Sequence, residues 1–185
     1  IIGENGVGKT TLLRCLMSEL EHVEGVVKWS ENASVGYCPQ DSGRFFDNDL
    51  TLMDWMSQWR RPCHNDLSVR GMLGRMLFTD DDANKKARNC SGGEKNHLLF
   101  GMLMMGDINV LIMDEPTNHM DIEAIDALNN ALKDFEGTLI FVSHDREFVS
   151  SLATRIIDIK DKKLIDFQGS LDEYLDNQVQ VKKIA

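Results

Sequence analysis

The sequence predicts an α/β fold with a mostly parallel sheet, and three observations support that prediction. Short apolar runs typical of buried strands alternate with segments of helical periodicity along the 185 residues. Apolar residues make up 42% of the chain, an ordinary share for a globular protein that excludes disordered and low-complexity classes. Strands that alternate with helices build a parallel sheet covered by those helices.

The expected elements follow one another in a regular order. The first part of the chain carries the end of a strand at 1–2, a helix at 10–20, strands at 26–29 and 33–37, and a loop at 41–50. A block without strands comes next, with helices at 51–60, 66–77 and 91–105 and a polar stretch at 80–89. The remainder carries strands at 109–113, 138–142, 155–160 and 163–167, the last two joined at Asp161-Lys162, and helices at 121–134, 145–152 and 171–180.

We therefore expect a single domain over 1–185, with residues 51–105 forming a helical subdomain inserted into the α/β core. Only Ile1 and Ile2 precede the first glycine, whereas a strand normally has about five or six residues. We expect this domain to be incomplete at its N-terminus, with its first strands missing.

The net charge indicates which partners to expect, and the cysteine spacing indicates the compartment. Thirty acidic and twenty basic residues give a net charge of −10, which argues against a basic face that grips nucleic acid. No apolar run approaches the roughly 18 residues of a membrane helix, so no membrane insertion is expected. Four cysteines lack metal-ligand spacing and are interpreted as reduced cytosolic thiols: Cys15, Cys38, Cys63 and Cys90.

Residues 3–10 fit the pattern G-x-x-x-x-G-K-[ST] of a phosphate-binding loop. The segment reads Gly3, Glu4, Asn5, Gly6, Val7, Gly8, Lys9 and Thr10, and Thr11 follows it. Glycines let successive N–H groups converge on phosphate oxygens, and the next helix points its positive end at them. The lysine adds a charge near the phosphates, and the threonine hydroxyl can ligate Mg²⁺. A helix-capping glycine turn is the alternative, but strand end, loop and helix stand in the order that phosphate binding requires.

Two adjacent carboxylates, Asp114 and Glu115, follow the apolar run 110–113. Ligands of α/β sheets lie at the carboxyl ends of strands. We expect Asp114 to help hold Mg²⁺ and Glu115 to orient or deprotonate the attacking water. A solvated strand end is the alternative interpretation.

The segment Ser91, Gly92, Gly93 and Glu94 begins a predicted helix and has two interpretations that can hold together. Ser91 and Glu94 have the spacing of a capping box. Two glycines in a first helical turn are poor helix formers, which favours close approach of the backbone to an anion.

Gln40 and His144 each follow a predicted strand. Gln40 can ligate Mg²⁺ or water, and His144 can hydrogen-bond a γ-phosphate. An ordinary loop glutamine and an N-cap cluster formed by Ser143 or Asp145 are the alternatives. The other histidines are interpreted as structural: His22, His64, His97 and His119.

Taken together, these segments resemble the ATP-binding cassette (ABC) ATPases over nearly the whole chain. The order of the five elements carries the likeness: Lys9 with its loop, Gln40, Ser91 to Glu94, Asp114-Glu115 and His144. The resemblance implies a phosphate-loop NTPase core that binds ATP and Mg²⁺. It also implies that two cassettes pair head to tail, so that the Ser-Gly-Gly-Glu segment of one faces the phosphate loop of the other.

Family roles then carry over to the matching positions. Residues 3–11 would hold the phosphates; Thr10, Gln40 and Asp114 would serve the metal. Glu115 would be the catalytic base and His144 the γ-phosphate sensor. Ser91 and Gly93 would reach the ATP of the partner cassette, and isolated hydrolysis would be weak or absent.

Within the superfamily, two segments resemble the F subfamily, whose members are soluble, cytoplasmic and act on ribosomes. They are Glu115-Pro116-Thr117-Asn118-His119-Met120-Asp121 and Ser143-His144-Asp145-Arg146-Glu147-Phe148, and the overall run is similar to a second cassette there. Two positions depart from the family's usual pattern. Cys90 stands where Leu usually precedes the Ser-Gly-Gly-Glu segment, and His97 stands where Arg is usual in the helix that this segment begins. A nucleotide-binding subunit of a membrane transporter and a non-hydrolysing, ATP-dependent dimerisation switch are the alternative functions.

Overall fold

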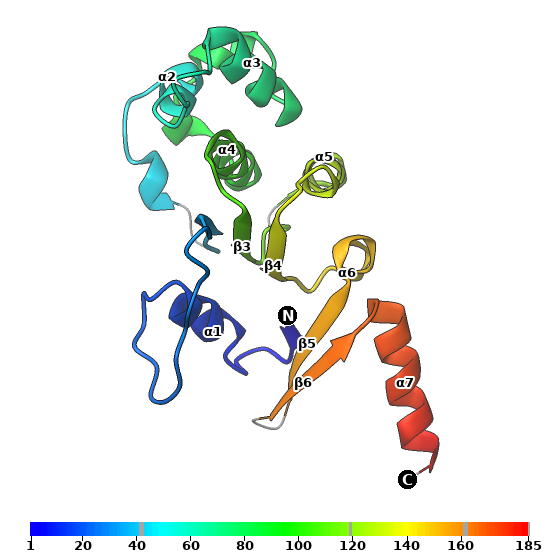
Figure 1. Cartoon of the computed structure of the whole chain (residues 1–185). Coiled ribbons are helices and arrows are strands. Elements are labelled where there is room, and N and C mark those ends of the chain that lie inside the picture. Colours follow the sequence, from blue (N-terminus) through cyan, green and yellow to red (C-terminus); the bar gives the residue numbers. More distant parts are fainter. Residues whose placement is uncertain (41–42, 119, 161–162, 185) are drawn as a thin grey trace. The chain divides into compact units, whose positions relative to one another are not determined.

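A computed structural model of the chain describes residues 1–40, 43–118, 120–160 and 163–184 (Figure 1). Helices and strands alternate along most of it, as the sequence predicts. The strands are β1 (Ile2–Gly3), β2 (Val35–Cys38), β3 (Val110–Asp114), β4 (Thr138–Val142), β5 (Arg155–Lys160) and β6 (Lys163–Gln168). The α-helices are α1 (Lys9–Leu16), α2 (Leu52–Ser57), α3 (Asp66–Arg75), α4 (Gly92–Met105), α5 (Ile122–Lys133), α6 (Arg146–Leu152) and α7 (Leu171–Ile184), and the short 3-10 turns are η1 (Gly43–Phe46), η2 (Asp81–Asn84) and η3 (Ala87–Asn89).

The chain divides into two compact units, and the division falls within β4. One unit comprises Ile1–Trp29 and Phe141–Ala185, and the other comprises Ser30–Ile140. The assignment of 1–185 to one domain, with 51–105 as a helical subdomain, stays a prediction. The described residues of 51–105 form helices and 3-10 turns, joined by one isolated bridge between Thr51 and Lys86.

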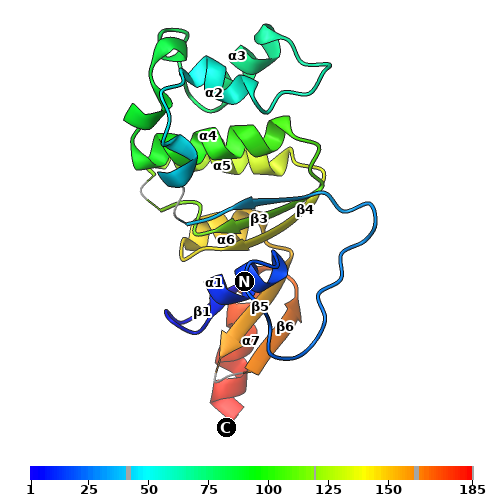
Figure 2. The ribbon, with the colours of Figure 1, turned by 90° about the vertical axis from the view of Figure 1, so that its left-hand side faces the viewer.

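In the unit of residues 30–140, β2 and β3 pair in parallel, with Val35 opposite Val110 and Cys38 opposite Met113. The five residues of β3 are all buried, as expected of a strand covered on both faces. Helices α4 and α5 lie over one face of this pair of strands (Figure 2). Strand β3 therefore forms the centre of the core of this unit.

The helical part of the same unit packs around aromatic and small side chains. Phe46 stacks on Trp55 of α2 with ring centroids 4.9 Å apart, and both rings are almost fully buried. Gly101 of α4 allows close approach, because a Cβ there would lie 2.9 Å from Cε of Met56 and 3.2 Å from Cγ of Met76. These contacts hold α2 and the end of α3 against α4.

In the other unit, β1 pairs in parallel with β5, and β5 pairs antiparallel with β6. Helix α7 is fixed to β5 by the hydroxyl of Tyr174, which donates to Oδ2 of Asp158 at 2.6 Å. Burial, together with this bond and the charge of Asp158, raises the pKa of Tyr174 to about 12. Strand β1 thus stands beside β5 at the point where the predicted phosphate loop begins.

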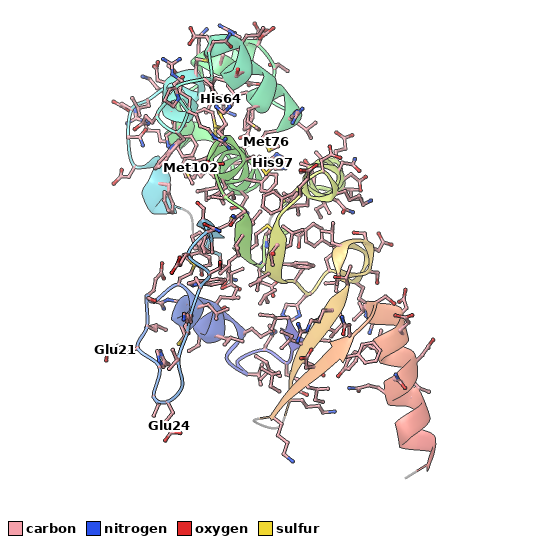
Figure 3. The ribbon with its side chains drawn as sticks, viewed as in Figure 1. Glu21, Glu24, His64, Met76, His97 and Met102 are labelled. Atoms are coloured by element: carbon pink, nitrogen blue, oxygen red, sulfur yellow. The ribbon has the colours of Figure 1, made fainter. Side chains whose placement is uncertain are left out.

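The strand expected at 26–29 does not form. Val26 is exposed, and Trp29 instead donates its indole N–H to the carbonyl of Leu16 at 3.2 Å. An apolar run needs a neighbouring strand for its hydrogen bonds, and among the described residues none pairs with it. Glu21 and Glu24 lie in the same loop between α1 and β2 (Figure 3). The predicted joint at Asp161-Lys162 lies outside the described residues, as does His119.

Candidate functional site

The predicted phosphate loop leaves β1 and leads directly into α1. Gly3, Gly6 and Gly8 have φ angles of 147°, 78° and 107°, in the region that favours glycine. A Cβ on Gly3 would lie 2.7 Å from the carbonyl oxygen of Ile159 on β5. The glycines are therefore required by the path of the backbone, as the motif predicts.

The amino end of α1 differs from those of the helices that follow it. No side-chain hydrogen bond caps α1, whose N-cap residue is Gly8. The next five helices each begin with a side chain that accepts a bond from their first turn: Thr51, Asn65, Ser91, Asp121 and Asp145. The first N–H groups of α1 are thus left without a side-chain cap, which is what an anion-binding helix end requires.

Lys9 brings its charge into the same loop. The side chain is 7% exposed, and its Nζ donates to the carbonyl oxygens of Gly3 at 2.8 Å and Glu4 at 3.0 Å. Thr10 and Thr11 are exposed on the first turn, whereas Leu13 is buried and anchors the helix. The loop therefore encloses an ammonium group beside the uncapped helix end.

Asp114 ends the buried strand β3 and is itself 1% exposed. Within the described part of the chain, neither of its carboxylate oxygens has a hydrogen-bond partner. An ionised carboxylate that is buried without a partner is costly, and a bound cation is one way to compensate its charge. This carboxylate therefore fits a metal ligand.

Glu115 follows in a backbone conformation that is uncommon for a residue with a side chain. Its φ angle is 51°, and it is 7% exposed. Its carbonyl oxygen accepts from the N–H of Asn118 at 3.2 Å, which closes a turn around Pro116. Such conformations gather at functional sites, where surrounding structure maintains them.

Gln40 leaves the same edge of the sheet as the acidic pair. Because Cys38 lies opposite Met113 in parallel strands, Gln40 and Glu115 each stand two residues beyond this register pair. Burial, and secondly the charge of Asp114, raise the pKa of the Cys38 thiol to about 12. The register thus places Gln40, Asp114 and Glu115 at the carboxyl edge of β2 and β3.

The segment Ser91 to Glu94 forms the capping box that its spacing predicts. Oγ of Ser91 accepts from the N–H of Glu94 at 3.2 Å, and Oε2 of Glu94 accepts from the N–H of Ser91 at 2.7 Å. The N–H groups of Gly92 and Gly93 belong to the first helical turn, where no intrahelical acceptor exists. Capping and anion binding are therefore compatible at this helix end.

Two further residues of α4 tie its start to the chain that follows Glu115. Nδ2 of Asn96 donates to the carbonyl of Asn118 at 3.3 Å, and Nε2 of His97 lies 3.1 Å from the carbonyl oxygen of Ala124 on α5. His97 is 4% exposed and lies near Met76 (Figure 3). Sequence reasoning missed Asn96, because its partner lies 22 residues away.

His144 follows β4 and is exposed. The cap of α6 is Asp145, whose Oδ1 accepts from the N–H of Phe148 at 3.1 Å, while Oγ of Ser143 accepts from the N–H of Asp145 at 3.1 Å. The N-cap cluster considered from sequence is thus real, and it leaves the imidazole of His144 outside the cap.

The candidate residues are distributed over the two units. The phosphate loop at 3–11 and His144 belong to one unit. Gln40, the segment 91–94 and the pair Asp114-Glu115 belong to the other. Among the described residues, no helix is long and apolar enough to cross a membrane.

Comparisons with known proteins show the family of the chain. A family model described as "ABC transporter" matches residues 1–118. The chain is 57% identical over 175 residues to the probable ATP-binding protein YbiT of Escherichia coli O157:H7, covering 95% of this chain and 33% of that protein. It is 34% identical over 183 residues to ABC transporter F family member 5 of Arabidopsis thaliana, covering 98% of this chain and 26% of that protein.

A solved structure with the same fold is that of an archaeal ribosome recycling factor, aABCE1, in complex with the ribosomal stalk protein aP1. The TM-score is 0.78 at 22% sequence identity, over 97% of this chain and 36% of that one. The chain thus spans about a quarter to just over a third of the length of these three proteins. Since the family model covers most of the chain and the fold agrees, the chain belongs to the ABC transporter family of ATP-binding domains and is close in sequence to F-family proteins.

Proposed function

We propose that this chain is one ATP-hydrolysing cassette of a ribosome-associated translation factor of the F subfamily. The observations that carry the proposal are two chemically complementary features, each described within its own unit. One is the loop that encloses Lys9 beside the uncapped end of α1, and the other is the buried, unpartnered carboxylate of Asp114. The first suits a polyphosphate and the second suits its metal ion.

In this proposal, residues 3–11 bind the phosphates of ATP through backbone N–H groups and Nζ of Lys9. Thr10, Gln40 and Asp114 serve the metal, because hydroxyl, amide and carboxylate oxygens are the ligands that Mg²⁺ accepts. Bound Mg²⁺ supplies positive charge that neutralises the phosphates. The isolation of the Asp114 carboxylate and the charge of Lys9 support this assignment.

The remaining residues act on the reaction itself. Glu115 orients the attacking water and accepts its proton, and its burial and its unusual backbone conformation support this role. His144 contacts the γ-phosphate from the end of β4. Ser91 and Gly93 offer hydroxyl and N–H donors to the nucleotide of a partner cassette.

Hydrolysis then depends on a pair of cassettes in head-to-tail contact. The chain contains one phosphate loop and one Ser-Gly-Gly-Glu segment, and in the proposed pair these serve different nucleotides. The sequence relatives are about three times longer, so a second cassette in the same protein is the natural partner. The chain alone should bind Mg-ATP weakly and hydrolyse little.

The ribosomal role rests on similarity to F-family proteins and implies a cytoplasmic location. We test it with the intact protein that carries this chain, in which Glu115→Gln should trap the ATP-bound pair. Ribosomes sedimented with ATP should retain this variant, and ribosomes sedimented with ADP should not. Absence of ATP-dependent co-sedimentation would refute the ribosomal role, and copurification with a membrane permease would favour a transporter subunit instead.

A further inference from the structure

Lys85 directs its amine at the Ser-Gly-Gly-Glu segment from the loop between η2 and η3. Its Nζ lies 2.7 Å from Oε1 of Glu94, while the other oxygen of that carboxylate accepts from the N–H of Ser91 at 2.7 Å. About a third of each charged side chain is exposed, 31% for Lys85 and 34% for Glu94. The two oxygens of Glu94 therefore serve two partners, one ionic and one in the capping box.

The backbone around Lys85 is itself fixed. The carbonyl of Lys85 accepts from the N–H of Leu52 at 2.9 Å, and the N–H of Ala87 donates to the carbonyl of Leu50 at 3.0 Å. These bonds flank the isolated bridge between Thr51 and Lys86 and attach the loop to the start of α2. Lys85 thus joins the start of α2 to the start of α4.

Lys85 differs from its basic neighbours in the group that its side chain contacts. Nζ of Lys86 donates to the carbonyl of Asp49, and Nη1 of Arg88 lies 2.6 Å from Oδ1 of Asp49. Lys86 and Arg88 are therefore engaged with Asp49, whereas Lys85 faces Glu94.

The charge of Glu94 poses a problem for the proposed function. A carboxylate in the first turn of α4 repels the phosphates that Ser91 and Gly93 are proposed to bind. Burial would raise the pKa of Glu94, but bonds from Lys85 and Ser91 outweigh it and lower that pKa, so the carboxylate stays ionised. The bond to Glu94 likewise raises the pKa of Lys85.

We propose that Lys85 is a positioning residue, which neutralises Glu94 and holds its carboxylate in the capping box so that Ser91 can engage the nucleotide of the partner cassette. The proposal rests on the proposed function for its consequence in hydrolysis. The positioning itself depends only on the contacts among Lys85, Glu94 and Ser91.

The test compares Lys85→Met, Glu94→Gln and the double variant in the intact protein, with Lys86→Met as the matched control. Hydrogen exchange at the amides of Ser91 and Glu94 reports positioning, and the ATP dependence of phosphate release reports function. Lys85→Met should speed exchange about three- to tenfold and raise the ATP concentration for half-maximal turnover by a similar factor. Glutamine still forms a capping box, so the double variant should return close to Glu94→Gln, and Lys86→Met should change neither quantity.

Unchanged exchange in Lys85→Met would overturn the proposal whatever the turnover. If turnover falls in Lys85→Met and stays low in the double variant, Lys85 does not act by neutralising Glu94. A wild-type protein that hydrolyses no ATP, yet whose exchange responds as expected, would refute the proposed function and leave the positioning intact.

Discussion

Asp114 and Glu115 are neighbours in sequence but face different physical demands. Asp114 completes a strand whose every residue is buried, and among the described residues neither of its carboxylate oxygens has a hydrogen-bond partner. Glu115 begins a turn with a positive φ angle, which costs energy for a residue with a Cβ. Burial without a hydrogen-bond partner and a positive φ angle each carry an energetic cost in general, and both are expected if the pair serves a metal-bound nucleotide.

Replacing Asp114 with Asn tests this interpretation at the residue scale. Replacement of a buried carboxylate that lacks a hydrogen-bond partner by a neutral amide should raise the free energy of unfolding by about 1–3 kcal/mol in the absence of nucleotide. The same change should abolish the further stabilisation that Mg-ATP gives to the wild type. Denaturant unfolding with and without Mg-ATP measures both effects, with Asp134→Asn as the control. A variant less stable than wild type without nucleotide would show that Asp114 has a structural role instead.

At the scale of elements, the start of α4 contacts both the loop before it and the segment after Glu115. Lys85 reaches it from the preceding loop, and Asn96 and His97 tie it to the segment after Glu115. The start of α4 is therefore attached to both neighbouring segments. Local spacing predicts the capping box, but no local pattern predicts these longer contacts, since they depend on packing of distant segments.

The contact of His97 with α5 predicts a pH dependence of stability. Burial lowers the pKa of His97 below its ordinary value of 6.5, against the opposing effects of the Ala124 carbonyl and the charges of Asp121 and Glu94. As pH falls through 6.5, the unfolded chain takes up a proton that the folded ring resists, so stability is lost from there downward.

Between pH 7.5 and 5.5, wild type should lose up to about 1 kcal/mol more than His97→Gln, whose side chain does not titrate. Urea unfolding at the two pH values measures the difference. His22→Gln, on an exposed loop, is the control and should behave as wild type does. Equal losses in wild type and His97→Gln would show that the ring does not resist protonation.

At the scale of the whole molecule, the alternation of strands and helices could be predicted from the sequence, whereas the roles of the candidate residues stay predictions. The glycine loop and the helix after it could be predicted, because glycines, lysine and helix stand in one continuous segment. The absence of a strand at 26–29 could not be predicted, because a strand forms only beside a partner strand. In the structure the indole N–H of Trp29 donates to the carbonyl of Leu16 instead. Lys85 was missed as an individual contributor, because its role depends on the position of Glu94 in space.

Phosphate release by the intact protein at saturating Mg-ATP, compared between wild type and Glu115→Gln, tests the central claim most directly. Loss of the general base should lower turnover by about 100-fold or more, while ATP binding to the loop around Lys9 is retained. Turnover in Glu115→Gln equal to that of wild type would contradict the claim that this chain is a hydrolytic cassette.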